Sequence, residues 1–404
     1  MIVKTAPELT APPAPPGPIE WIRKNLFSNW FNSVLTLVAL VFLYFVITAT
    51  LRWVLFTADW RPVTVAPLLF LVGQYPREEL WRPGLCLLIS AFLIGMSWGV
   101  WERYVKAFAV FLAFLLAGLA LFPLETPTIT LTIRGVFLTA PALIYLGYRL
   151  GRLQAVTGRL VTLLWIVAGA LISLVLLPGI PGIPGLNTVP TTAWGGLLIT
   201  LLLAVGGIVL SFPIGVLLAL GRRSSLPVVK VFSILFIEVI RGVPLVTILF
   251  MFSVILALFL PAESRIDRIL RALMGTVVFS AAYMAENVRG GLQAIPPGQV
   301  EAAKALGLNN FQITTLIVLP QALRLVIPAI VGQFIALFKD TTLVVIVGIN
   351  DLLGVGNAVL KLQPEFFRLQ MEVYLFIAAI FWIFSYFMSH ASLQLEKSLG
   401  VGER

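Results

Sequence analysis

Ten long apolar runs dominate this sequence, and they constrain its fold more than any other feature. A helix that crosses a bilayer needs about 20 consecutive, mostly apolar residues. Runs of this kind lie near residues 34–56, 82–101, 105–123, 133–150, 160–178, 194–220, 231–260, 270–290, 324–347 and 371–393. They predict an all-α membrane protein with about ten transmembrane helices. A further apolar run, 63–73, is too short to span and is predicted to be interfacial or re-entrant.

Composition supports the bilayer as the solvent of this chain. Of the 404 residues, 59% are hydrophobic and 11% are charged, whereas soluble domains carry roughly 25% charged residues. The net charge of +10 comes from Lys and Arg residues scattered between the apolar runs. Charges placed in this way orient transmembrane helices. A nucleic-acid partner is not expected, because the sequence shows no basic stripe with interleaved aromatic residues.

The loops between the runs predict the orientation. Lys and Arg are in excess in the loops on the N-terminal side of the membrane, which places that side in the cytoplasm. Ten spans then place both termini there. Residues 1–33 are predicted to be a Pro-rich cytoplasmic tail, because the prolines of 11–18 rule out the apolar helix of a signal peptide. Residues 396–404 are the predicted C-terminal cytoplasmic tail.

The chain divides near residue 180, in an uncharged loop rich in Gly and Pro. Residues 34–179 form a predicted N-terminal extension of five transmembrane helices, and residues 190–395 a predicted core of five more. Ionisable residues at membrane depth are costly and are therefore functional candidates. They occur in the apolar runs of the core, at Glu238, Arg241, Glu286, Arg289, Lys339 and Asp340.

The loop between the eighth and ninth runs predicts a helix–turn–helix elbow on the cytoplasmic face. Two prolines, Pro296 and Pro297, break the incoming helix, and a short helix is expected over 299–306. Gly307 is placed where a left-handed residue ends a helix, and Asn309 or Asn310 can cap the next one. Small residues leave one side of the first helix bare for a partner, namely Ala302, Ala303 and Ala305.

These residues resemble the "EAA" signature of ABC importer permeases. The signature consists here of Glu301-Ala302-Ala303, Gly307 four residues later, and then Ile317, Leu319 and Pro320. The resemblance implies a type I ABC importer permease core with its EAA loop at 295–320. It also implies that this loop couples the chain to a separate ATPase, through Glu301, Ala302, Ala303, Gly307, Leu319 and Pro320.

Further motifs resemble the permeases for uptake of polar amino acids, the group that handles histidine, glutamate, glutamine and arginine. They are the segments 194–200, 238–245, 283–296 and 333–343. The five extra N-terminal spans are similar to the long permease of general L-amino-acid transporters. Asn287 and Thr342 depart slightly from the usual pattern. The resemblance implies a bacterial inner-membrane importer of polar L-amino acids that works by alternating access. It would act with ATPase subunits, a second permease, preferably a different chain, and a periplasmic binding protein.

Two interpretations of the core charges stay open. In the first, they line the substrate pathway, where a cationic and an anionic group meet the carboxylate and ammonium of an amino acid. The candidates are Thr200, Glu238, Arg241, Tyr283, Glu286, Lys339, Asp340 and Thr341. In the second, the charges form structural ion pairs, for which the i,i+3 spacings of Glu238 with Arg241 and Glu286 with Arg289 are suitable.

The sequence predicts no catalytic, cofactor or metal site in this chain. It contains no Gly-Lys dipeptide, so it lacks the phosphate-binding loop of P-loop ATPases. ATP and Mg are therefore expected on the partner ATPase. Cys86 and His390 are the single residues of their types. A secondary transporter remains an alternative, although the two halves do not look alike; a channel or a membrane enzyme would leave the elbow signature unexplained.

Overall fold

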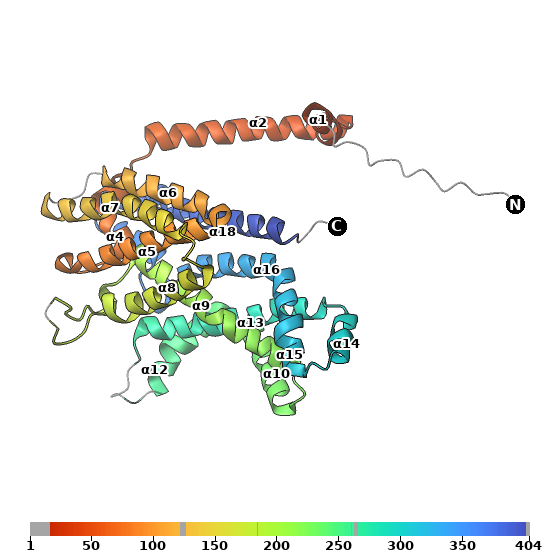
Figure 1. The fold of residues 1–404 in the computed structure, drawn as a ribbon. Helices are drawn as coiled ribbons and strands as arrows, with labels where there is room; N and C mark the ends of the chain where they lie inside the picture. Colours follow the sequence, from red (N-terminus) through yellow and green to blue (C-terminus); the bar gives the residue numbers. More distant parts are fainter. Residues whose placement is uncertain (1–16, 122–126, 184, 260, 262–265, 401–404) are drawn as a thin grey trace. The chain divides into compact units, whose positions relative to one another are not determined.

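The chain is built from helices (Figure 1). A computed structural model describes residues 17–121, 127–183, 185–259, 261 and 266–400. Within these residues every element is a helix, and the strand-like pairings are two isolated β-bridges. Contacts divide the chain into two units, Met1–Asp59 and Trp60–Arg404. The all-α fold class predicted from the sequence is confirmed.

The first unit holds one long apolar helix. It comprises α1 (Pro18–Asn25), α2 (Trp30–Arg52) and the π-helical turn η1 (Trp53–Thr57). Asn29 caps α2 by accepting a hydrogen bond of 2.7 Å from the backbone N–H of Asn32, so the span begins a few residues before the predicted position. The predicted tail falls partly outside the described residues, which begin at Gly17.

The rest of the predicted extension belongs to the second unit. Its four long helices follow the predicted spans, and two short helices precede them. The elements are α3 (Arg61–Val65), α4 (Pro67–Val72), η2 (Arg77–Glu79), α5 (Trp81–Val100), α6 (Glu102–Ala120), α7 (Pro127–Gly151), α8 (Gly158–Leu171) and η3 (Ile172–Leu176). Helices α5 and α7 approach closely because glycines face each other across them: a Cβ on Gly95 would lie 2.1 Å from the carbonyl oxygen of Ile144.

The predicted core follows in the same unit, after η4 (Thr191–Ala193). Its elements are α9 (Gly196–Arg222), α10 (Pro227–Arg241), α11 (Leu245–Phe250), η5 (Met251–Ile255), α12 (Leu256–Phe259), α13 (Arg268–Gln293), α14 (Pro297–Ala305), α15 (Asn310–Gln312), η6 (Ile313–Val318), α16 (Leu319–Asp340), η7 (Thr341–Val347), α17 (Leu352–Val359), η8 (Pro364–Arg368) and α18 (Gln370–Leu399). Helix α18 ends at Leu399, so it includes part of the predicted C-terminal tail, whose last residues, 401–404, lie outside the described ones.

One predicted span is sharply bent. The run 231–260 was predicted as one span, and within it the chain bends by 107° between Pro227–Arg241 and Leu245–Phe259. The break falls at Gly242-Val243-Pro244, where proline supplies no N–H to continue the helix and clashes with the preceding turn. The described residues therefore contain nine helices long and apolar enough to span a membrane, or ten if the bent pair is one span.

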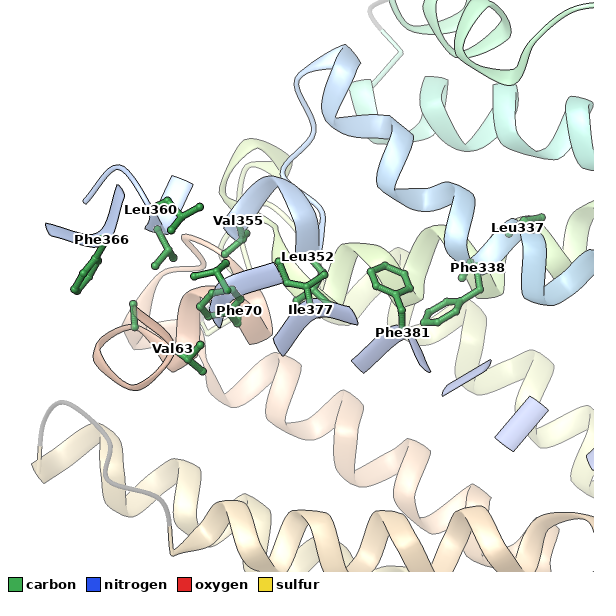
Figure 2. Close-up of a cluster of buried hydrophobic side chains, with 14 residues drawn as sticks. Val63, Phe70, Leu337, Phe338, Leu352, Val355, Leu360, Phe366, Ile377 and Phe381 are labelled. Carbon is green, nitrogen blue, oxygen red and sulfur yellow. The ribbon is translucent and has the colours of Figure 1, made fainter. Parts of the chain in front are cut away.

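The short apolar run that precedes the second predicted span packs into the core. Helices α3 and α4 are too short to cross a bilayer. Their residues Val63, Ala66 and Phe70 are buried in one cluster with residues of α17 and α18 (Figure 2). Phe70 meets Phe376 edge to face at 5.2 Å between ring centroids. This part of the extension thus contributes to the same hydrophobic interior as the core.

A seam of backbone contacts joins three segments that are distant in sequence. The N–H of Gly195 donates to the carbonyl of Val72 at 3.2 Å, and the N–H of Gly196 donates to Asn350 at 3.0 Å. Gly73 has φ +71°, and a Cβ there would lie 2.5 Å from the nitrogen of Gly195. Only glycine fits this approach, because the atoms that a side chain would meet belong to the backbone.

We expect Gly73→Ala to destabilise the protein far more than Gly182→Ala. Both glycines have a positive φ, which costs an alanine about 1–2 kcal/mol, but no atom of the described residues lies within 4 Å of a Cβ on Gly182. The difference between the variants therefore reports the clash at the seam together with the backbone of Gly73, whose φ of 71° and ψ of −141° favour glycine. Thermal unfolding in detergent measures this difference in stability. Equal unfolding midpoints for the two variants would contradict the close backbone contact at the seam.

Candidate functional site

The elbow, residues 297–320, is ordered by its own sequence. Helix α14 begins at Pro297, two residues before the predicted start, and ends ahead of Gly307, which has φ +79°. Asn309 then caps α15: its side chain accepts from the N–H of Gln312, and the Gln312 side chain accepts from the N–H of Asn309, both at 2.9 Å. This reciprocal capping box fixes the direction of the second helix. The predicted helix–turn–helix is confirmed.

The predicted coupling residues differ in their exposure. Glu301, Ala302, Gly307 and Pro320 are exposed, and Leu319 is half-buried. Ala303, which was expected on the bare side of the first helix, is instead buried within the chain. It faces the second helix of the elbow because α14 packs on η6, whose Ile313 and Val318 share the same cluster.

Two exposed apolar side chains were missed in the sequence. Leu306 is 80% exposed and Phe311 is 76% exposed, on either side of the turn at Gly307. Large apolar residues are expected throughout a membrane protein, so their apolar character alone did not indicate that these two side chains are exposed. The polar sequence around the turn was the available sign that this segment leaves the bilayer. Exposed apolar residues in a polar loop indicate a surface that a partner covers.

A network of ion pairs joins α9, α10 and α13. Glu286 lies at its centre and pairs with Arg289 on its own helix, with an Nε–Oε1 distance of 2.8 Å. Its other oxygen lies 3.7 Å from both Arg222 and Arg241. Arg222 also pairs with Glu238 at 2.8 Å. Three guanidinium groups thus surround two carboxylates.

The network confirms one predicted pair and corrects another. Glu286 and Arg289 pair as their i,i+3 spacing indicates. Glu238 and Arg241 have the same spacing but bond to different partners, because α10 runs back along the end of α9 and its last residue turns towards α13. Arg222 was not singled out in the sequence, since its partners lie on α10 and α13 and depend on how these helices pack against the end of α9.

Tyr283 completes this region on α13, one turn before Glu286. The guanidinium of Arg241 lies 5.5 Å from the centroid of its ring, a cation–π contact. Tyr283, Glu286 and Arg241 are each partly exposed. The structure therefore brings together four of the predicted pathway residues: Arg241, Tyr283 and Glu286, with Glu238 joined to them through Arg222.

The other predicted pathway residues lie elsewhere. Lys339 and Asp340 end α16; Lys339 is exposed and Asp340 half-buried. Among the described residues neither forms an ion pair. Thr341 is buried and donates its hydroxyl to the carbonyl of Phe338 at 2.7 Å.

Thr200 joins two elements of the fold. It is fully buried, and its hydroxyl oxygen accepts from the N–H of Leu352 at 3.0 Å. That hydroxyl also donates to the carbonyl of Gly196 at 3.1 Å. The bond links α9 to the start of α17, so Thr200 is placed to hold this junction rather than to face a cavity.

Asp351 is a buried acid that sequence analysis missed. It is fully buried outside the long helices, and its Oδ1 accepts from the N–H of Gly354 at 2.9 Å, which caps α17. Its Oδ2 is buried without a hydrogen-bond partner among the described residues. Burial raises the pKa of this carboxyl from 3.8 to about 6. An Asp directly before an apolar helical run is the signal that could have identified the cap.

We expect Asp351→Asn to stabilise the protein at pH 8 and to have little effect at about pH 3, where the carboxyl is protonated in both the folded and the unfolded state. Because its pKa is higher in the folded state, the folded protein binds the proton more tightly, and stability falls as pH rises from about 4 to about 6. The change from 3.8 to about 6 corresponds to about 3 kcal/mol. Asn keeps the cap and removes the charge. Thermal unfolding at both pH values tests this, and an equal shift at both would contradict it.

Known proteins resemble this chain over nearly its whole length. The family model described as "Binding-protein-dependent transport system inner membrane component" matches residues 211–399. The inner membrane amino-acid ABC transporter permease protein YhdY of Escherichia coli K12 is 38% identical over 401 residues, which is 95% of this chain and 93% of YhdY. The glutamate/glutamine/aspartate/asparagine transport system permease protein BztC of Rhodobacter capsulatus is 37% identical over 433 residues, 97% of each chain.

A solved structure is also similar in part. The crystal structure of an amino acid ABC transporter with histidines is 30% identical, with a TM-score of 0.45, over 50% of this chain and 92% of that chain.

The apolar helices and the family match define a multi-pass transport protein of the inner membrane. The chain belongs to the family of amino-acid ABC transporter permeases. The resemblance inferred from the sequence motifs is confirmed.

Proposed function

We propose that this chain is the membrane-spanning subunit of an importer that moves polar L-amino acids across the cytoplasmic membrane by alternating access, driven by a separate ATPase. The observation that carries the proposal is the elbow. A turn set by Gly307 and a capping box presents Leu306 and Phe311 to solvent. A rigid segment with exposed apolar residues is suited to transmit movement from a partner.

The elbow residues have two kinds of role in this proposal. Glu301, Ala302 and Pro320 are exposed and would contact the ATPase directly, together with Leu306 and Phe311. Ala303, Gly307 and Leu319 would shape the elbow and join it to the transmembrane helices, since Ala303 and Leu319 pack in the cluster formed with α9, α10, α13 and α16. Movement of the elbow then reaches these helices directly.

The network around Glu286 is the proposed wall of the substrate pathway. The network contains two carboxylates and three guanidinium groups, on Arg222, Arg241 and Arg289, so its net charge is positive by one. Tyr283 offers a hydroxyl beside it. A carboxylate of an amino acid could accept charge-assisted hydrogen bonds here. Lys339 and Asp340 carry further charge without an ion pair in the described residues, and at the far end of α16 they would meet the substrate at a different point along the pathway. Thr200 and Thr341 lie at the other ends of α9 and α16, where they would support the fold beside the pathway rather than this wall.

The proposed partners follow from the same charges. Lys339 is exposed on an apolar helix, a position that lipid covers at a high free-energy cost. A second permease subunit, preferably a different chain, would enclose it in a polar cavity. The elbow end of the bundle would face the cytoplasm, with both termini, and bind ATPase subunits that hold ATP and Mg. A periplasmic binding protein would deliver the substrate, and the substrates named for BztC support polar amino acids as cargo.

Photo-crosslinking tests the proposed docking surface. A photoreactive amino acid replaces Leu306 or Phe311, and the chain is co-expressed with its ATPase, second permease and binding protein. We expect adducts with the ATPase from both positions and none from Leu362, which is also exposed but lies in the loop after α17. Adducts from Leu362 alone would place the ATPase at the other end and contradict the proposal.

A further inference from the structure

The loop that leads to α9 is ordered by its own backbone. It comprises the described residues between Pro178 and Val189, and it carries no charged side chain. The N–H of Ile180 donates to the carbonyl of Leu186 at 2.7 Å, and the N–H of Val189 donates to the carbonyl of Pro178 at 2.8 Å. Three glycines with a positive φ allow its tight turns, namely Gly179, Gly182 and Gly185. The loop therefore holds a defined shape, although its described residues form neither helix nor strand.

A buried arginine of the extension fixes this loop in place. Arg82 of α5 is fully buried. It donates to the carbonyl of Asn187 at 2.7 Å and to that of Gly185 at 3.2 Å, and its Nε lies 3.0 Å from an oxygen of Glu79. Removing a guanidinium group from water is costly unless partners satisfy it, and two of these partners are carbonyls of the loop. A buried charge of the extension thus sets the shape of an exposed loop.

The loop is also joined to the core. Thr191, which follows the loop, donates its hydroxyl to Asp267. Asp267 caps α13 by accepting from the N–H of Ile269 at 2.8 Å. At the beginning of the loop, Tyr75 of the extension donates to the carbonyl of Leu177 at 3.1 Å. The loop therefore bridges the extension and the first turns of two core helices, α9 and α13.

This loop and the elbow lie at opposite ends of the second unit (Figure 1). Helices α9 and α13 run side by side in the same direction. Thr191 and Asp267 join their starts beside the loop. At their other ends, Arg223 donates to the carbonyl of Leu292 at 3.0 Å, a few residues before the elbow. The proposed function places the elbow in the cytoplasm and therefore the loop in the periplasm.

The end of the bundle that bears the loop carries an excess of basic side chains. Among the described residues of the second unit, four basic and two acidic residues are exposed at this end: Arg61, Arg77, Lys361 and Arg368 against Glu78 and Glu365. Lys and Arg are normally concentrated on the cytoplasmic side, so the orientation of the helices does not account for this excess. A positive surface is complementary to an acidic partner.

We propose that this end of the bundle, with the loop between Pro178 and Val189 as its rigid contact, is the docking surface for the periplasmic binding protein, which meets it with an acidic face. This inference rests on the proposed function, which places this end outside the cell membrane. It gives the extension a role in transport, because Arg82 shapes the surface that the binding protein contacts. Docking on the loop also reaches the first turns of α9 and α13, two of the helices that carry the proposed pathway.

Photo-crosslinking tests the surface in the assembled transporter in proteoliposomes. A photoreactive amino acid replaces Ile183, which is 42% exposed in the loop, or Leu163, which is 56% exposed within the apolar helix α8. The binding protein is added on the side of the loop. We expect its adducts from Ile183 and none from Leu163.

Two other results of this experiment have separate meanings. Adducts of Ile183 with lipid alone, while uptake still requires the binding protein, would overturn the docking surface and leave the proposed function intact. Adducts of Ile183 with the ATPase would reverse the orientation and contradict the proposed function itself, and the docking surface with it. The two failures are therefore distinguishable.

Charge reversal provides a second test. Lys361→Glu and Arg368→Glu are combined in one variant, and Lys230→Glu is the control, because Lys230 is exposed at the start of α10, at the elbow end. Uptake is measured while the concentration of binding protein is raised. We expect the half-saturating concentration to rise about tenfold for the double variant and to stay within about twofold for the control, because charges at the rim of an interface mainly govern association.

Maximal uptake separates docking from damage to the transporter. At saturating binding protein we expect the double variant to stay within about twofold of the wild type, and added salt should reduce the difference in half-saturating concentration. An unchanged half-saturating concentration would overturn the proposal.

Discussion

Replacing Gly307 by valine should reduce ATP-driven amino-acid uptake by more than about tenfold while the chain still inserts and assembles. Gly307 has φ +79°, and a β-branched residue is strongly disfavoured there. The turn would open, and α14 would no longer hold its angle to α15. Uptake into proteoliposomes measures the loss, and copurification of the ATPase measures assembly.

Two further variants separate backbone strain from added bulk. Asn tolerates the left-handed conformation, so Gly307→Asn should retain most of the uptake. Gly298 lies in α14, just before this turn, and is exposed; a Cβ added there would meet no atom of the described residues within 4 Å. Gly298→Val should therefore be close to wild type. Uptake by Gly307→Val at the wild-type rate would show that transport does not depend on the angle between α14 and α15.

Replacing Glu286 by glutamine should be the most damaging single change among the core charges. Glu286 pairs with Arg222, Arg241 and Arg289 and is only 22% exposed. Its loss leaves three guanidinium groups with Glu238 alone. Breaking a fully buried pair costs about 3–5 kcal/mol; because these groups are partly exposed, we expect about 1–3 kcal/mol, together with loss of uptake. Thermal unfolding and uptake measure the two effects.

Glu238→Gln is the matched control. Glu238 is 53% exposed and, among the described residues, forms a salt bridge with Arg222 alone; exposed pairs contribute about 1 kcal/mol or less. We expect its unfolding midpoint to stay near that of the wild type. If the two substitutions have the same effect, Glu286 is not the centre of the network.

Features set by neighbouring residues could be predicted from the sequence. The elbow is the clearest case: Gly307, Asn309 and the prolines before them act over a few residues, and the structure shows the predicted helix–turn–helix. The apolar spans were predicted for a similar reason, because each needs only its own length and composition. The resemblance to amino-acid permeases rested on motifs of the same local kind.

Features set by contacts between distant segments could not be predicted. Arg222 and Arg241 find their acidic partners only through the packing of α9, α10 and α13 against one another. Ala303 is buried because the second helix of the elbow returns over it. Thr200 bonds to a residue 152 positions later. Spacing along one helix does not encode these contacts.

The extension illustrates the same limit. The sequence divides near residue 180 by composition, but the contacts divide the chain after Asp59. Residues 60–75 join the interior of the core through Phe70 and the glycine seam. The short run at 63–73 indicated only that this segment does not span.

Reconstitution tests the central claim most directly, namely that this chain is the transport subunit of an ATP-driven amino-acid importer. The chain is purified with its ATPase, second permease and binding protein, and placed in proteoliposomes with labelled glutamate, arginine or leucine. The account predicts uptake that requires ATP on the side of the elbow and is lost when the binding protein is left out. Uptake driven by an ion gradient alone, without a copurifying ATPase, would contradict it and favour a secondary transporter.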